Sequence, residues 1–258
     1  MLRKMNKKIF LDIPFIPKKP ISLALVDSRY KARLEGFFIK NKIIPIFVEK
    51  CTALYPAISC HPDIQCHPLG GNRIVIAPNA SQSLKNQLIQ HKFEIIVGNT
   101  RLESNYPNNI AYNVARIGRF AFHNMKYTDP ILKEELEAQG VELIHVNQGY
   151  AKCSVAIVDE DSMITSDKGI ANAAKEIGFN VLLINPGFIE LPGLNYGFIG
   201  GATGLLSQDK LGFAGNWKTH KDSRKIENFL RQRNKIPVAL DMDPLIDVGS
   251  IIPLKEYE

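Results

Sequence analysis

Residues 150–186, YAKCSVAIVDEDSMITSDKGIANAAKEIGFNVLLINP, contain the pattern that decides the fold. Two short apolar runs at 153–158 and 163–165 flank an acidic turn, and they predict two consecutive strands. Asp167 stands where a helix N-cap is expected, ahead of an apolar stripe at 170, 173, 174 and 177. Gly178 then ends the helix, and residues 181–184 form a closing strand. The stretch therefore predicts one unit of strand, turn, strand, helix and strand.

The rest of the chain repeats this unit, giving about five copies in all. Further helices are predicted to begin at Ser28, Ser81, Asp129 and Asp222, each followed by an apolar closing strand. Before the last four helices the pattern predicts a hairpin, with first strands at 63–68, 110–117, 153–158 and 198–206. The fold class is thus α/β (α+β), with about three strands for each helix.

The two ends of the chain complement each other in this pattern. The first unit begins directly with the strand Ile21–Asp27 and lacks a hairpin, while a strand at 248–254 is left over. Pairing of these two strands would close the units into a ring and remove the exposed sheet edges. A three-layer α/β sandwich remains the alternative fold.

Length alone does not separate one domain from two, but the repeated units that close in a ring predict a single domain at 21–258. An irregular N-terminal arm is expected at 1–20, which prolines 14, 17 and 20 interrupt. No apolar run approaches the roughly 20 residues that a membrane helix requires. No export signal is recognised, because charge and proline break the apolar region that follows the basic start. Four cysteines without the spacing of a secreted scaffold are expected to be thiols, and we expect a cytoplasmic location.

The net charge of +6 is compatible with an anionic partner. The basic residues are spread along the chain, however, and the densest group, between 218 and 235, follows a predicted exposed helix. Two interpretations stay open: a solvated lysine-rich surface, or a surface that binds RNA.

The densest cluster of reactive side chains is CHPDIQCH at residues 60–67. In a strand, Asp63, Gln65 and His67 would share one face, and Ile64 and Cys66 would share the other. Three interpretations stay open. The cluster is part of an active site, it binds zinc through Cys60, Cys66 and the two histidines, or it is a loop with buried thiols.

Other candidates are single residues at equivalent places in the predicted units. Cys153 opens its strand, either as a buried apolar residue or as a nucleophile in a central channel. Asn113 and Arg116 could bind a carboxylate, and Asp27 and Asp247 could hold a cation. The glycine-rich stretch 197–204 is not expected to bind a nucleotide, since no helix follows it; its glycines are expected where inner strands crowd the axis. No metal or cofactor is predicted.

Five such units closing in a ring, over residues 21–254, resemble the pentein fold, the five-bladed β/α-propeller of guanidino-group-modifying enzymes. The sequence is similar to an uncharacterised bacterial branch of that fold. The resemblance implies a thiolate that attacks a guanidinium carbon, a histidine acid/base, and carboxylates that hold the cation. The family cysteine close to the C-terminus is not found here, because that segment reads DVGSII at 247–252 and Ser250 is its only hydroxyl.

Two functions therefore remain open. The first is binding of a small guanidino or amino-acid-like ligand in a central channel, with C–N hydrolase or amidinotransferase-like activity. The second is a non-catalytic pentein that binds a macromolecule such as ribosomal RNA. The predicted catalytic residues are His61, Asp63, His67 and Cys153, and the predicted ligand-binding residues are Asp27, Asn113, Arg116, Asp247 and Ser250.

Overall fold

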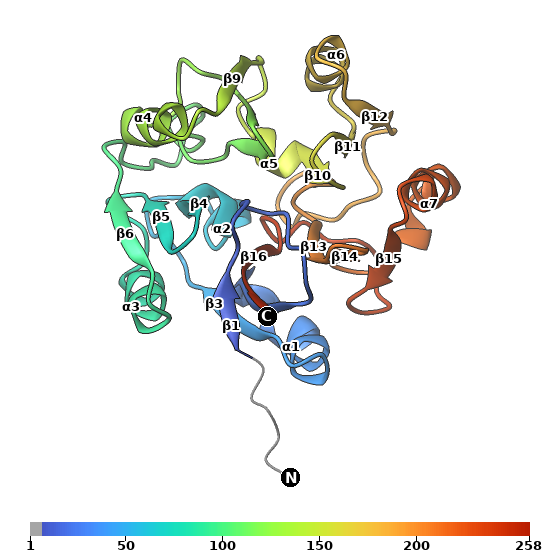
Figure 1. Ribbon diagram of the computed structural model, residues 1–258, viewed down its shortest axis with the longest axis horizontal. Helices are drawn as coiled ribbons and strands as arrows, with labels where there is room; N and C mark the ends of the chain where they lie inside the picture. The colour runs from blue at the N-terminus through green and yellow to red at the C-terminus, as the bar shows by residue number, and fades with distance from the viewer. Residues whose placement is uncertain (1–6) are drawn as a thin grey trace.

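The computed structural model describes residues 7–258, and these residues form five small sheets (Figure 1). Four of the sheets have three strands in chain order. They are β4 (Cys66–Gly70), β5 (Arg73–Ile76) and β6 (Glu94–Val97); β7 (Ala115–Ile117), β8 (Phe120–His123) and β9 (Glu142–His145); β10 (Val155–Ile157), β11 (Ser162–Thr165) and β12 (Asn180–Leu183); and β13 (Thr203–Ser207), β14 (Lys210–Phe213) and β15 (Ile236–Ala239). In each sheet the first two strands pair antiparallel and the last two pair parallel.

A helix crosses over between the parallel strands of each of these sheets, as the repeat pattern predicts. The helices are α3 (Gln82–Gln90), α4 (Pro130–Ala138), α6 (Lys168–Glu176) and α7 (Ser223–Gln232). Three of the five predicted N-caps are confirmed, because the side chains of Ser81, Asp129 and Asp167 accept a backbone N–H from the first turn. Ser28 does not cap the first helix, which begins after Tyr30 without a side-chain cap. Asp222 differs, since its carboxylate accepts hydrogen bonds from Asn185 instead of capping α7.

The remaining sheet combines the two ends of the chain. Its strands lie in the order β1 (Lys8–Phe10), β16 (Ile252–Tyr257), β2 (Ile21–Asp27) and β3 (Ile44–Val48). β16 pairs antiparallel with β2, and β2 pairs parallel with β3 across α1 (Lys31–Lys40). The C-terminal strand thus takes the place that a first strand has in the other sheets. Part of the predicted irregular arm is the strand β1, and residues 1–6 of that arm lie outside the described residues.

The helices α1, α3, α4, α6 and α7 lie at the periphery, and the short helices α2 (Pro62–Gln65) and α5 (Ala151–Ser154) lie near the centre (Figure 1). The five sheets are separate, with no strand shared between them in the described chain, so the alternative of a three-layer sandwich is wrong. None of the helices between Lys7 and Glu258 is both long and apolar enough to cross a bilayer.

The predicted first strands began too early in each of the four units that have a hairpin. Residues 62–65 and 151–154 are single helical turns, and the strands at 115 and 203 start several residues later than predicted. The first helix also starts late, with a 3₁₀ turn at Ser28–Tyr30 before α1. The reason for the late strands is tertiary. The residues before each first strand form hydrogen bonds to a neighbouring unit at the centre and not along a ladder, as the next section describes.

Candidate active site

A circle of hydrogen bonds joins the inner segments of the five units. Four inner residues, Asn113, Cys153, Gly201 and Ser250, each stand two positions before the first strand of their own sheet. The bonds of the circle run from Asp63 N to Gly249 O, Asn113 Nδ2 to Asp63 O, Lys152 N to Asn113 O, Gly201 N to Cys153 O and Ser250 N to Gly201 O, at 2.8–3.3 Å. Residues far apart in the sequence are thereby held in one cluster.

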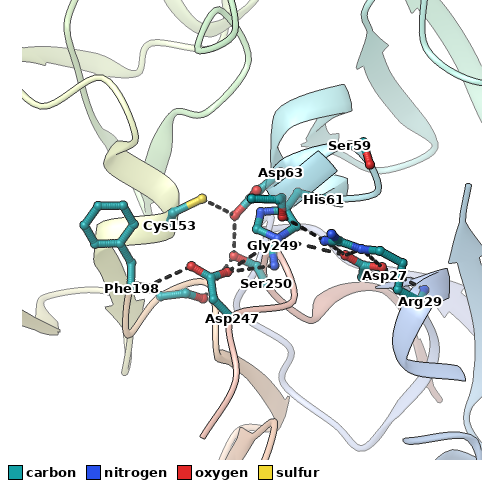
Figure 2. A network of polar contacts seen from close by, with 12 residues as sticks. Asp27, Arg29, Ser59, His61, Asp63, Cys153, Phe198, Asp247, Gly249 and Ser250 are labelled. Atoms are coloured by element: carbon teal, nitrogen blue, oxygen red, sulfur yellow. Dashed lines mark hydrogen bonds and ion pairs between the residues drawn. The ribbon is translucent and has the colours of Figure 1, made fainter. Parts of the chain in front are cut away.

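Asp63 is the centre of the side-chain contacts in this cluster (Figure 2). Its Oδ2 accepts a hydrogen bond from Ser250 Oγ at 2.7 Å and from Cys153 Sγ at 3.1 Å. Asn113 Nδ2 also contacts Cys153 Sγ, at 3.2 Å, and Lys152 Nζ donates to Ser250 Oγ at 2.8 Å. Pro62 at the first position of α2 starts the turn that directs Asp63 towards these groups.

Burial controls the protonation of this cluster. The pKa of Asp63 is raised by burial, and the nearby Lys152 ammonium opposes that rise. The pKa of Cys153 is raised well above its ordinary value by burial and by the negative charges of Asp63 and Asp247. Burial also lowers the pKa of Lys152. Without a ligand, Cys153 is therefore a protonated thiol that donates its S–H to Asp63.

His61 lies between two more carboxylates. Its Nε2 is 3.9 Å from Asp27 Oδ2 and 3.9 Å from Asp247 Oδ1, and neither ring nitrogen has a hydrogen-bond partner in the described part of the chain. Burial, with the charge of Arg29, lowers the pKa of His61 to about 3. The ring is therefore neutral at pH 7, and these two contacts are not ion pairs.

The two carboxylates beside His61 differ in their partners. Asp27 accepts from Nε of Arg29 at 3.0 Å with both of its oxygens, so its charge is paired. Asp247 accepts only the backbone N–H groups of Phe198 and Gly249, at 2.9 Å each. Burial, followed by the charge of Asp63, raises the pKa of Asp247 to about 7. No Lys or Arg of residues 7–258 forms an ion pair with Asp247.

A cavity of about 240 Å³ opens beside this cluster. The side chains of Cys153, His61 and Asp247 line it together, which brings a thiol, an imidazole and a carboxylate to one space. The other lining residues are Tyr55, Ile58, Tyr150, Leu191, Leu194, Asn195, Tyr196 and Phe198.

The cluster and cavity include seven of the nine predicted site residues. His61, Cys153 and Asp247 line the cavity; Asp63, Asn113, Ser250 and Asp27 contact or adjoin these three.

His67 and Arg116 lie elsewhere, and the predictions for them need correction. His67 is buried with its ring 5.5 Å from that of Phe15. It follows a helical turn, so it does not share a strand face with Asp63. Arg116 donates to Leu69 O at 3.1 Å and Gln139 Oε1 at 2.6 Å, so its guanidinium is used within the fold.

The zinc interpretation also fails for the predicted ligands. Among residues 7–258, the one group of three or more metal-ligating side chains is His61, Asp63 and Cys153, whose ligand atoms lie within 4.8 Å of one another. Nitrogen, oxygen and sulfur atoms at this spacing could hold a divalent ion such as Zn²⁺. Cys60, Cys66 and His67 do not belong to the group.

Several residues of the site were missed by the sequence analysis. Lys152 precedes Cys153 but gives no local sign of being buried, and the aromatic residues at 150, 196 and 198 stand in segments without a clear period. The glycines at 197 and 201 are the signal that could have identified Tyr196 and Phe198. A Cβ at either glycine would overlap the side chain of Asp247, so both positions require glycine.

Comparisons with known proteins agree with this architecture. The model of a family described as "Family of unknown function (DUF6873)" matches residues 25–252. No curated protein matches the chain at a significant level.

Among solved structures, the fold is similar to that of SxtG, an amidinotransferase from Microseira wollei in the saxitoxin biosynthetic pathway, with 11% identity, 90% of this chain and 92% of that chain covered, and a TM-score of 0.54. It is also similar to an agmatine deiminase from C. jejuni with substrate bound (9% identity, 100% and 99% covered, TM-score 0.55). The inosamine-phosphate amidinotransferase StrB1 from Streptomyces griseus gives 10% identity, 90% and 91% covered, and a TM-score of 0.51. The chain therefore belongs to the family of unknown function DUF6873, and it has the pentein fold of the guanidino-group-modifying enzymes.

Proposed function

We propose that this pentein binds a small organic cation of the guanidinium type in the cavity and acts on one of its C–N bonds. The observation that carries the proposal is the environment of Asp247. This buried carboxylate lies on the cavity wall beside the Cys153 thiol, and no side-chain cation among the described residues pairs with it. A cation in the cavity would supply the missing charge.

The other two buried carboxylates of the site already have cations nearby. Asp27 is paired with Arg29, and the charge of Lys152 acts on Asp63. A guanidinium suits the remaining site, because it can donate two parallel hydrogen bonds to one carboxylate. The side chains of Tyr150 and Phe198 line the same space, and a cation over either ring would be attracted further.

Ligand binding would also activate the thiol. A cation next to Cys153 favours the thiolate, which is the nucleophile. The thiol proton passes to Asp63 Oδ2, which Sγ already contacts at 3.1 Å. Sγ forms a bond to the guanidinium carbon, a C–N bond breaks, and the leaving nitrogen takes the proton from Asp63.

A second step would release the product. Neutral His61 takes a proton from a water molecule that attacks the same carbon, and the C–S bond then breaks. His61 returns its proton to the thiolate, and the second proton of the attacking water passes from the new ureido oxygen to the departing ammonia, which leaves as ammonium. The balance is that of hydrolysis: guanidinium and water give a ureido product and an ammonium ion. A second amine in place of water would give amidino transfer.

The test uses the full chain with butylguanidine and agmatine as probes. Calorimetry should detect binding, and an ammonium assay should detect release of nitrogen. Cys153→Ser should keep binding and lose release, while Asp247→Asn should lose at least about tenfold in affinity. Cys51→Ser is the matched control, because that buried thiol contacts Asn79 O and does not line the cavity. Failure of the wild type to bind any guanidinium at millimolar concentration would refute the proposal.

We also propose that the five sheets are the blades of a propeller, closed by the pairing of β16 with β2. The circle of hydrogen bonds at the centre and the place of β16 in the first sheet support closure. The ends are adjacent, since Glu258 N donates to Lys7 O at 2.9 Å. Circular permutants that join these ends and open at the exposed Gly140 or Gly178 should unfold cooperatively. A chain that stops at residue 251 should not, and unfolded permutants at both openings would contradict closure.

The cysteines support a cytoplasmic location as part of the same proposal. All four are buried free thiols, as suits a reducing compartment.

A further inference from the structure

The cavity wall is short of positive charge. Among the lining residues that the structure describes, Asp247 is the one carboxylate, and none is Lys or Arg. The two cations beside the cluster, Lys152 and Arg29, already have partners. Lys152 Nζ donates to Ser250 Oγ, and Arg29 donates to Asp27 and to the carbonyls of Pro56 and Ala57. A negatively charged group on a ligand would therefore meet no cation on this wall.

The rest of the wall is largely apolar. Three aliphatic side chains and four aromatic rings line it, and the rings form a continuous surface. The ring centroids of Tyr150 and Phe198 are 6.4 Å apart, and those of Tyr196 and Phe198 are also 6.4 Å apart. Asn195 is the single side-chain amide in the lining.

The apolar surface continues to the outside of the molecule. Leu194 and Tyr196 line the cavity, yet they are 48% and 42% exposed, so they lie at its mouth. The cavity volume of about 240 Å³ is enough for a small organic cation, which would also touch the apolar mouth.

We infer that the ligand of this cavity is a cation without a carboxylate, carried on an apolar body, and not a free amino acid. This inference rests on the proposed function for the cationic group, and it narrows the amino-acid-like class expected from the sequence. The physical reason is desolvation. A carboxylate that enters the cavity loses its water without gaining a charged partner, whereas an apolar chain gains contact with the aromatic wall.

The test compares two ligands that differ by one carboxylate. Calorimetry on the full chain at pH 7.5 should show agmatine binding at least tenfold more tightly than arginine. Butylguanidine, which lacks both the carboxylate and the terminal amine, should bind at least as tightly as agmatine. Arginine binding equal to or tighter than that of agmatine would overturn the inference.

A second pair separates this inference from the proposed function. Phenethylamine and phenylalanine also differ by one carboxylate, but neither contains a guanidinium. If no guanidinium binds and phenethylamine binds at least tenfold more tightly than phenylalanine, the proposed function fails and the inference holds. If arginine binds more tightly than agmatine, and Asp247→Asn abolishes the binding of both ligands, the proposed function holds and the inference fails. If none of these compounds binds at millimolar concentration, both fail.

A substitution at the mouth tests the charge argument directly. Leu194→Lys places a cation where the wall has none, at a position exposed enough to accept it. The arginine-to-agmatine affinity ratio should rise at least tenfold, because the carboxylate then has a partner. Leu194→Gln is the matched control without charge and should leave the ratio within about twofold of the wild type. Equal ratios in the two variants would overturn the inference.

Discussion

Asp247→Asn tests how strongly the fold disfavours a charge at this position. The substitution keeps the size of the side chain and removes its ionisation. One of the two backbone N–H donors, from Phe198 or Gly249, then faces an amide NH₂ and loses its acceptor. That loss should cost about 1–3 kcal/mol at every pH. We therefore compare the free energies of unfolding of the variant and the wild type, and ask how their difference changes with pH.

The direction and size of that change follow from the pKa of Asp247. Burial raises this pKa from its ordinary value of 3.8 to about 7. Between these values the folded state binds more protons at Asp247 than the unfolded state, so the wild type loses stability as the pH rises. The loss begins near pH 4, is complete above about pH 7, and amounts to roughly 4 kcal/mol at about 1.4 kcal/mol per pKa unit. The variant has no such loss.

Urea unfolding of both proteins at pH 4.5, 5.5, 6.5 and 7.5 measures the difference. The free energy of unfolding of the variant should rise relative to that of the wild type at each step in pH, by a total of a few kcal/mol. The buried His67, whose pKa burial lowers to about 3, acts with the opposite sign but is present in both proteins and cancels. His61 lies 3.9 Å from Asp247 Oδ1, so its response to the substitution is part of the measured difference. Asp243→Asn, at an exposed carboxylate, reports the effect of losing a negative charge in general. A flat difference between pH 4.5 and 7.5 would refute the reasoning.

Three further results are expected. Gly201→Ala should lower the free energy of unfolding by at least about 2 kcal/mol, because its methyl group would overlap a buried carboxylate. Gly36→Ala, in a helix with open space around it, should raise the free energy of unfolding by about 0.5–1 kcal/mol. Equal effects of the two substitutions would contradict the close packing at Gly201. Alkylation of Cys153, followed by peptide mass spectrometry, should be at least about tenfold slower in the folded than in the denatured protein at pH 7.5. The alkylation rate of the folded protein should still increase with pH above pH 9, whereas a plateau near pH 7 would show a thiolate. Lys152→Met should cost about 3–5 kcal/mol in urea unfolding, because the buried Asp63 loses its nearby cation, and a cost below 1 kcal/mol would show that Asp63 is not ionised.

The elements that could be predicted from the sequence are those whose signals are local. Ser81, Asp129 and Asp167 each stand directly before an apolar helical stripe, and each caps its helix as predicted. The residues before the first strands could not be predicted in the same way. Residues 62–65 have the composition of a strand or loop, and their conformation depends on a bond from Asp63 N to Gly249, far along the chain.

The candidate site was predictable by residue type more than by geometry. Asp63, Cys153 and Asp247 were selected because carboxylates and thiols are the groups that the expected chemistry needs, and they do meet. His67 was selected by strand alternation from Asp63, and the helical turn between them removes that relation. Lys152 resembles any surface lysine in the sequence, because its burial follows only from the packing of α5 at the centre.

Four inner residues occupy matching places, each two residues before a first strand: Asn113, Cys153, Gly201 and Ser250. This equivalence allows the reactive groups to change position during evolution. The side chains or backbones of the four residues enter one common space from different directions. A nucleophile, a hydroxyl or an amide can therefore be exchanged between neighbouring modules by single substitutions, while the scaffold stays the same. Members of one lineage can in this way change their chemistry, or lose it, without any rearrangement of the chain.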